Sequence, residues 1–139
     1  MGKEKVVLDT NILVSALGWR GNPNLIFERI LNGEIELIIS DKQLAEIIKV
    51  LDYPKFDFSN EQKSSFINIL LEVSTLIKLD KIVEVVKEDP DDNIIVTSAI
   101  TGKAGFIISG DEHLLKLKKF KKVKILNAND FLNIKKEET

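Results

Sequence analysis

Four short apolar runs, separated by stretches with helical periodicity, constrain the fold more than any other feature of the chain. The runs are KVVLD (5–9), IELIIS (35–40), GFIISG (105–110) and KVKIL (122–126). Strands that are apolar at almost every position are typical of a parallel sheet, because the crossover helices bury both of its faces. We therefore predict an α/β fold with a central, mostly parallel sheet and right-handed crossovers.

The helical stretches are marked by caps, stops and apolar stripes. Ser40 with Gln43, and Ser59 with Gln62, have the spacing of a capping box, and Gly33 is a helix stop. The first box opens a helix whose predicted apolar stripe consists of Leu44, Ile47, Ile48 and Leu51. The predicted helices span 22–34, 40–52, 59–77, 91–101, 111–117 and 127–134.

Composition narrows the class of protein. The 139 residues suit a single domain (1–139), and 44% apolar with 30% charged residues is typical of a soluble globular protein. The net charge of −2 gives no overall sign of a polyanionic partner, so any binding of nucleic acid would depend on local basic patches. Because there is no cysteine, disulfides and thiolate metal sites are excluded. No apolar run approaches the roughly 20 residues of a membrane span, so we expect a cytoplasmic protein.

Acidic residues fall where the predicted parallel strands end. Ligands of such sheets bind beyond the carboxyl ends of the strands, so side chains placed there are expected to meet. The candidates are Asp9 at the end of the first strand, Glu46 in the second turn of the helix after the second strand, Asp111 after the third strand, and Asp91 and Asp92 at the start of the helix before it.

Carboxylates that lie close together repel and raise one another's pKa unless a cation binds between them. Oxygen ligands, with no cysteine and one histidine in the chain, favour Mg²⁺ or Mn²⁺ over zinc. Such a site is typical of phosphate-ester hydrolysis.

Each acid also has a purely structural interpretation. Asp9 can form an Asx turn and Asp111 can cap the next helix. Asp91 and Asp92 suit a first helical turn, and Glu46 lies off the apolar stripe and can face solvent. We assign no role to His113, because a lone histidine is more often structural.

Three segments together resemble the PIN-domain family of metal-dependent ribonucleases. They are VVLDTNILVSAL (6–17), EDPDDNIIVTSAI (88–100) and FIISGDEHLL (106–115), and the resemblance extends from about Val6 to Leu132. The chain is most similar to the single-domain, VapC-like ribonucleases that are the toxins of toxin–antitoxin pairs. The resemblance implies a three-layer α/β/α sandwich, an RNA substrate, an antitoxin partner and a homodimer.

The resemblance also implies roles for individual residues. It places Asp9, Glu46, Asp92 and Asp111 in the catalytic cluster, with the metal held by Asp9, Asp92 and Asp111. Glu46 would complete the cluster or orient the attacking water. Asn11 and Ser109 would support the cluster. Asp91 stays an alternative to Asp92.

Two segments are candidate substrate contacts. KLKKFKKVK (116–124) places six lysines around Phe120, and Lys118, Lys119 and Lys121 are the predicted contacts to the RNA backbone. The alternative is a solvated loop and strand edge protected by lysines. The loop with Trp19 and Arg20 suits either a partner contact or a packed turn. The alternative function is a non-catalytic scaffold that binds RNA or a protein partner and holds a structural metal ion.

Overall fold

The computed structural model describes residues 3–18, 22–86 and 89–137. The strands are β1 (Glu4–Leu8), β2 (Ile35–Ser40), β3 (Ser74–Ile77), β4 (Phe106–Ile108), β5 (Lys119–Phe120) and β6 (Val123–Leu126). The helices are α1 (Thr10–Gly18), α2 (Asn22–Leu31), α3 (Asp41–Leu51), α4 (Asn60–Val73), α5 (Pro90–Thr101), α6 (Glu112–Leu117) and α7 (Ala128–Glu137), with a 3₁₀ turn, η1 (Pro54–Phe56), after α3.

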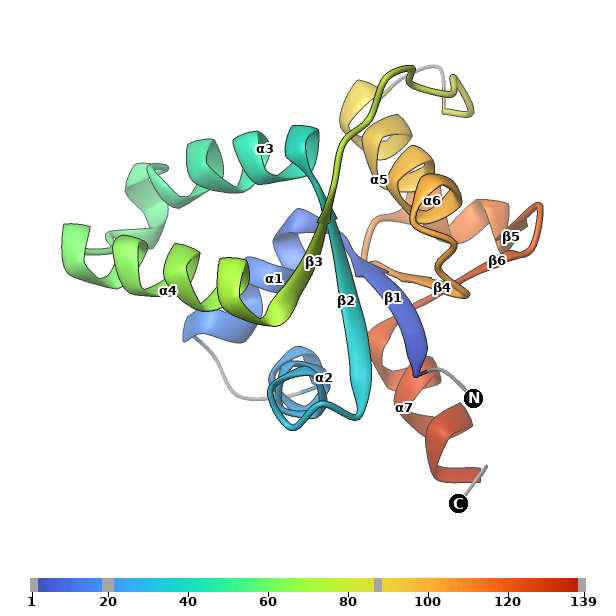
Figure 1. The fold of residues 1–139 in the computed structure, drawn as a ribbon, viewed down its shortest axis with the longest axis horizontal. Helices are drawn as coiled ribbons and strands as arrows, with labels where there is room; N and C mark the ends of the chain where they lie inside the picture. Colours follow the sequence, from blue (N-terminus) through green and yellow to red (C-terminus); the bar gives the residue numbers. More distant parts are fainter. Residues whose placement is uncertain (1–2, 19–21, 87–88, 138–139) are drawn as a thin grey trace.

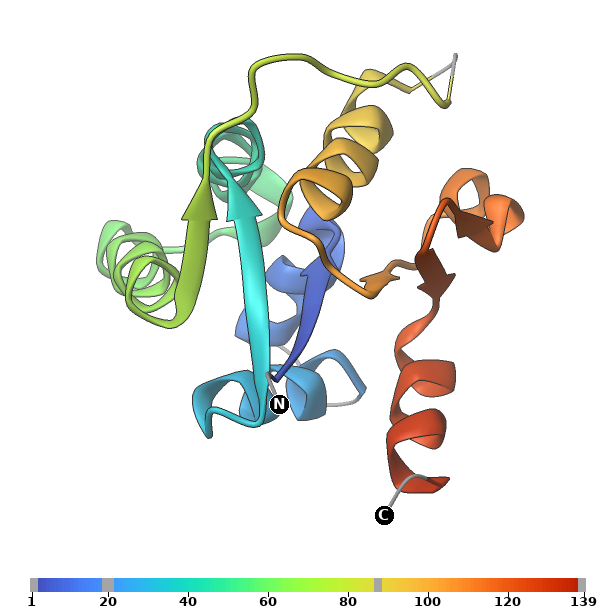
Figure 2. The same ribbon diagram turned by 45° about the vertical axis from the view of Figure 1, so that its right-hand side comes forward.

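The strands form one sheet in the order β3-β2-β1-β4-β6-β5. All neighbours are parallel except β5 and β6, which form an antiparallel hairpin at one edge. The carboxyl ends of β1, β2 and β3 therefore lie together, on the side where α3 and α5 begin (Figure 2). The predicted α/β fold with a mostly parallel sheet is confirmed.

Helices cover both faces of the sheet (Figure 1). Successive residues of a strand point to opposite faces, so Val6 and Leu8 pack with α1, α2, α3, α4 and α7, whereas Val7 packs with α5 and α6. All three valine and leucine side chains are fully buried. This arrangement confirms the three-layer α/β/α sandwich.

The predicted helix 59–77 is too long. Its Ser59–Gln62 capping box forms, but α4 ends at Val73 and residues 74–77 become β3. The ladder to β2, from Leu37 opposite Ser74 to Ser40 opposite Ile77, provides the backbone pairing that a longer helix would have provided. The apolar period of this segment therefore continues into an edge strand.

The start of α3 also differs from the prediction. Ser40 Oγ accepts a hydrogen bond from Gln43 N at 3.1 Å, but Gln43 Nε2 donates to Leu8 O at 2.6 Å instead of closing a capping box. Ile48 was expected in the apolar stripe and is 48% exposed. Because Gln43 anchors α3 to the end of β1, the second turn of α3 is held beside the carboxyl edge of the sheet.

A second contact anchors α5 at the same edge. Ser98 Oγ donates a hydrogen bond to Ser40 Oγ at 2.8 Å, and both side chains are buried. The last residue of β2 is thereby linked to α5 as well as to α3. The two helices therefore flank the carboxyl ends of the parallel strands, where the predicted acids lie.

Candidate active site

Asp9 connects the central strand to the first helix. Its backbone N–H donates to Ile108 O at 3.0 Å, which continues the β1–β4 pairing, and its Oδ1 accepts from Ile12 N at 2.9 Å and so caps α1. Its Oδ2 accepts a hydrogen bond from the Ser109 hydroxyl. The carboxylate is only 8% exposed. Asp9 therefore has the turn-forming role that was the structural alternative, and it also reaches the sheet edge.

Ser109 links Asp9 to Asp111. The Ser109 side chain is fully buried, and its Oγ accepts from Asp111 N at 2.9 Å while its hydroxyl donates to Asp9. Asp111 in turn caps α6, since its Oδ1 accepts from His113 N at 2.7 Å. The ring Nδ1 of His113 lies 3.8 Å from the same oxygen. The supporting position predicted for Ser109 fits these contacts.

The first turn of α5 places two acids on different sides. Asp89 is the N-cap and accepts a hydrogen bond from Asp91 N at 3.0 Å, and Pro90 follows at the first helical position. Asp92 is 6% exposed, and its Oδ2 is buried without a hydrogen-bond partner among the described residues. Asp91 is exposed and lies beside Glu46.

Glu46 projects from α3 toward these acids. The side chain is half-buried, and its Oε2 has no hydrogen-bond partner within the described part of the chain. Sequence periodicity alone favoured a solvated position for Glu46. The structure places it in the wall of a cavity instead, because Gln43 fixes α3 against the end of β1.

Three carboxylates of the site, those of Glu46, Asp92 and Asp9, have raised pKa values. Burial raises the pKa of Glu46 to about 7, opposed by the nearby Thr10 hydroxyl and reinforced by Asp91 and Asp9. Burial also raises the pKa of Asp92 to about 7, and the charges of Asp111, Asp89 and Asp9 raise it further. The pKa of Asp9 is raised as well, mainly by burial, although hydrogen bonds from Ser109, Ile12 and Gly110 oppose the change.

A cavity of about 490 Å³ opens between α3 and α5 over the sheet edge. Its acidic lining consists of Asp9, Glu46, Asp89, Asp91, Asp92 and Asp111. Asn11 also lines it and is exposed, whereas Ser109 lies beneath the surface. The structure thus brings all the predicted acids to one cavity.

A compact group of possible ligand atoms among the described residues differs from the predicted metal set. One ligand atom each from Asp89, Asp92, Asp111 and His113 lies within 4.8 Å of the others. Asp9 lies next to this group, and its two carboxylate oxygens accept hydrogen bonds from Ile12 N and from the Ser109 hydroxyl. The three carboxylates of this group, with the buried Asp92 Oδ2 lacking a hydrogen-bond partner among the described residues, fit a divalent cation.

Asp89 and His113 were not predicted as site residues. Asp89 stands in the sequence as a helix cap before Pro90, and His113 as the only histidine of the chain. Neither local pattern indicates a metal ligand. Asp89 and His113 come close to each other only because the first turns of α5 and α6 lie side by side in the fold.

The predicted RNA-contacting lysines lie elsewhere. Lys118, Lys119 and Lys121 are exposed where α6 runs into the β5–β6 hairpin, and they do not line the cavity. Lys121 Nζ lies 5.9 Å from the centre of the Phe120 ring, which is itself half-buried. Trp19 and Arg20 lie outside the described residues.

A sequence model of one family covers most of the chain. Residues 5–113 match the model described as PIN domain, a range that includes all the acids of the cavity. The chain belongs to the PIN-domain family. No curated protein matches the chain by sequence.

Solved structures share the PIN-domain fold at low sequence identity. One is VapBC2 from Rickettsia felis bound to a DNA fragment from their promoter, with a TM-score of 0.61, 19% identity, and coverage of 88% of this chain and 98% of that chain. Another is PAE2754 from Pyrobaculum aerophilum, with a TM-score of 0.60, 14% identity, and coverage of 94% and 87%. Among the described residues of this PIN domain, no helix has the length and apolarity to cross a membrane.

Proposed function

We propose that this PIN domain is a metal-dependent ribonuclease that hydrolyses RNA phosphodiester bonds, and that it is the toxin of a toxin–antitoxin pair. One observation carries the proposal. Two carboxylates with pKa values of about 7, Glu46 and Asp92, face one open cavity with buried oxygens that lack hydrogen-bond partners. Structural acids are normally paired or solvated, so this arrangement supports a site for a cation and a substrate.

Asp9, Asp92 and Asp111 are the proposed ligands of Mg²⁺ or Mn²⁺, and Asp89 is an additional candidate from the geometry. When bound, such an ion would lower the pKa of water and neutralise charge on the reacting phosphate. Ser109 donates a hydrogen bond to the Asp9 carboxylate and accepts one from the Asp111 backbone N–H, so it fixes these two acids relative to one another. Asn11, which lines the same cavity, is proposed to support the cluster.

Glu46 is the proposed general base. In the metal-free protein the Glu46 carboxylate, with a pKa of about 7, is half deprotonated near neutral pH, and a cation bound nearby would favour the ionised form that accepts a proton. The water oxygen would form a bond to phosphorus, the phosphorus–oxygen bond to the leaving ribose would break, the water proton would pass to Glu46, and the leaving ribose oxygen would take up a proton from solvent water. Asp91, which lies beside Glu46, would tune its pKa.

The partner and the location of the protein are also proposals. The VapBC2 structure supports an antitoxin partner by similarity of fold, and we propose one for this chain together with a homodimer. We propose that the protein acts in the cytoplasm, a reducing compartment with which a chain without cysteine is compatible. Lys118, Lys119 and Lys121 are proposed as secondary contacts to the RNA backbone.

A scaffold with a structural ion is the second candidate. It is favoured by one observation, namely that Asp9 and Asp111 both cap helices and so have structural roles without any catalysis. In that case the acids would bind a cation that stabilises the sheet edge and no phosphodiester would be cleaved.

Metal dependence and product chemistry together test the nuclease. Single-stranded RNA of mixed sequence would be incubated with the purified chain in Mg²⁺, in Mn²⁺ and in EDTA. We expect cleavage only with metal, and products without a 2′,3′-cyclic phosphate, because water rather than the ribose hydroxyl attacks. Metal binding without cleavage of any RNA tested would favour the scaffold, whereas cleavage in EDTA would contradict the proposed mechanism.

A further inference from the structure

One face of α3 and the turn after it forms the wall of the cavity opposite the acids of α5. Lys42, Glu46, Lys49 and Tyr53 follow one another at intervals of four, three and four residues, and all four line the cavity. Such intervals place side chains on one helical face. Lys42 and Lys49 are separated by about 10 Å along the helix, at 1.5 Å per residue. The wall therefore carries one lysine on each side of Glu46, the proposed base.

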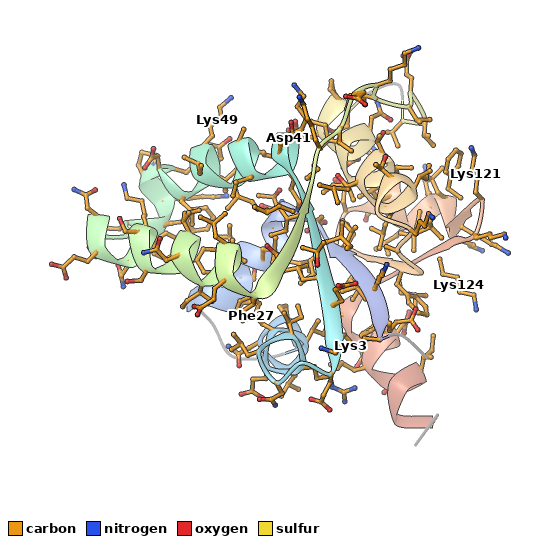
Figure 3. All side chains as sticks on the ribbon, viewed as in Figure 1. Lys3, Phe27, Asp41, Lys49, Lys121 and Lys124 are labelled. Atoms are coloured by element: carbon orange, nitrogen blue, oxygen red, sulfur yellow. The ribbon has the colours of Figure 1, made fainter. Side chains whose placement is uncertain are left out.

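These cations are available to a ligand. Lys42 and Lys49 are exposed, and within the described ranges neither forms an ion pair with a carboxylate. Neither lysine is among the main causes of the raised pKa values of Glu46 and Asp92. Figure 3 shows the Lys49 side chain extending from α3 away from the sheet. The lysines thus line the acidic cavity without neutralising it, and their charge can act on an anion.

Tyr53 adds an aromatic surface to the same wall. It is 42% exposed although it follows directly from the end of α3, where Tyr53 N donates to Val50 O at 3.0 Å. Lys55, in the next turn, also lines the cavity, with its Nζ 5.0 Å above the Phe56 ring. Cations interleaved with an exposed ring are typical of sites that bind single-stranded nucleic acid through phosphates and base stacking.

We propose that Lys42, Lys49 and Tyr53 form a subsite that selects single-stranded RNA and positions it over the acids. The lysines bind phosphates on either side of the one that is cleaved, and Tyr53 stacks on a base. In a duplex each base face is covered by its neighbours, so a protein ring reaches a base only in an unpaired strand. This inference rests on the proposed function, because it takes the cavity as the place where RNA is cleaved.

Binding in EDTA tests the subsite separately from cleavage. The wild-type chain, Lys42→Gln and Lys49→Gln would be titrated with a labelled single strand over a range of salt concentrations. The control is Lys3→Gln, which removes the same charge near the amino end of β1, far from the cavity (Figure 3). We expect the slope of log affinity against log salt to fall by about 0.7 for each cavity lysine and to be unchanged for Lys3→Gln.

The stacking contact has its own signature. Tyr53→Ala is expected to weaken single-strand binding at least about fivefold without changing the salt slope, while Tyr53→Phe binds like the wild type. A duplex of the same sequence is expected to bind more weakly than the single strand and to be insensitive to Tyr53→Ala.

The outcomes separate this inference from the proposed function. If the wild type cleaves RNA in Mn²⁺ but the cavity variants keep its affinity and salt slope, the subsite is wrong and the nuclease stands. If the variants lose affinity as expected but no protein cleaves RNA, the subsite stands and the nuclease is wrong. If the metal-free wild type does not bind RNA, the subsite is wrong, and cleavage in Mn²⁺ alone decides whether the chain is a nuclease.

Discussion

Replacing Asp92 by asparagine is expected to stabilise the metal-free protein. The pKa of Asp92 rises from the usual 3.8 to about 7 on folding, mainly through burial. At about 1.4 kcal/mol for each pH unit between the two values, the upper limit of the cost of ionising it is about 4 kcal/mol. Water that enters the open cavity screens the charge, so we expect a gain of about 1–2 kcal/mol for Asp92→Asn at pH 8. For a chain of this length the gain corresponds to a rise in Tm of about 3–8 °C.

The sign of the pH dependence follows from proton binding. Between pH 3.8 and 7 the folded protein binds a proton at Asp92 that the unfolded chain has released, so the wild type loses stability as the pH rises through this interval. Asparagine does not titrate, so the advantage of the variant should shrink by more than half between pH 8 and pH 5. Asp80→Asn is the control, because Asp80 is exposed in the loop after β3.

Thermal unfolding of the three proteins at pH 8 and pH 5, with EDTA or Mn²⁺, gives the measurement. A ligand that binds only the folded state stabilises it by about 2.7 kcal/mol at 100 times its Kd. We expect this increase for the wild type and Asp80→Asn and its loss in Asp92→Asn. An Asp92→Asn variant that is no more stable than the wild type at pH 8 would refute the cost of ionising Asp92 in the folded protein. If that variant also keeps its response to Mn²⁺, Asp92 is not a metal ligand.

Two further predictions concern the base and the packing of α5. Glu46→Gln should lower the single-turnover rate constant of RNA cleavage at least about 100-fold, because the proposed base is lost. Glu72→Gln, an exposed substitution on α4, is the control and should leave the rate constant unchanged. Equal rate constants for the two variants would exclude Glu46 as the base. Gly102→Ala should destabilise the protein by about 1–3 kcal/mol in urea unfolding, because a Cβ there would lie 2.6 Å from Ile38 Cγ2. Gly110→Ala, with no atom within 4 Å of the added carbon, is the control, and equal stability of the two variants would contradict the packing argument.

Much of the fold could be predicted because its signals are local. The bounds of β2 are those of the apolar run 35–40, and Ser40 and Ser59 cap the helices that follow them as expected. The strand β3 was missed, since its four residues continue the apolar period of α4 and become a strand only by pairing with β2. Non-local pairing of this kind has no signature within the segment itself.

The sequence predicts the positions of those site residues that directly follow a strand. Asp9 and Asp111 lie at the sheet edge because β1 and β4 are parallel neighbours. The positions of Glu46 and Asp89 depend on long-range contacts, namely the Gln43–Leu8 hydrogen bond and the packing of α5 beside α6. Lys49 has the sequence context of any solvated helix lysine, and only its place in the cavity wall distinguishes it.

Cleavage of an end-labelled single-stranded RNA by the wild type, Asp9→Asn and Asp80→Asn, each with Mn²⁺ and with EDTA, tests the central claim most directly. Asp9 is the one acid of the cavity that joins the central strand, the cap of α1 and Ser109. We predict that the wild type and Asp80→Asn cleave the RNA with Mn²⁺ and not with EDTA, and that Asp9→Asn does not cleave it. Cleavage by Asp9→Asn at the wild-type rate, or cleavage in EDTA, would contradict a metal-dependent ribonuclease built on these carboxylates.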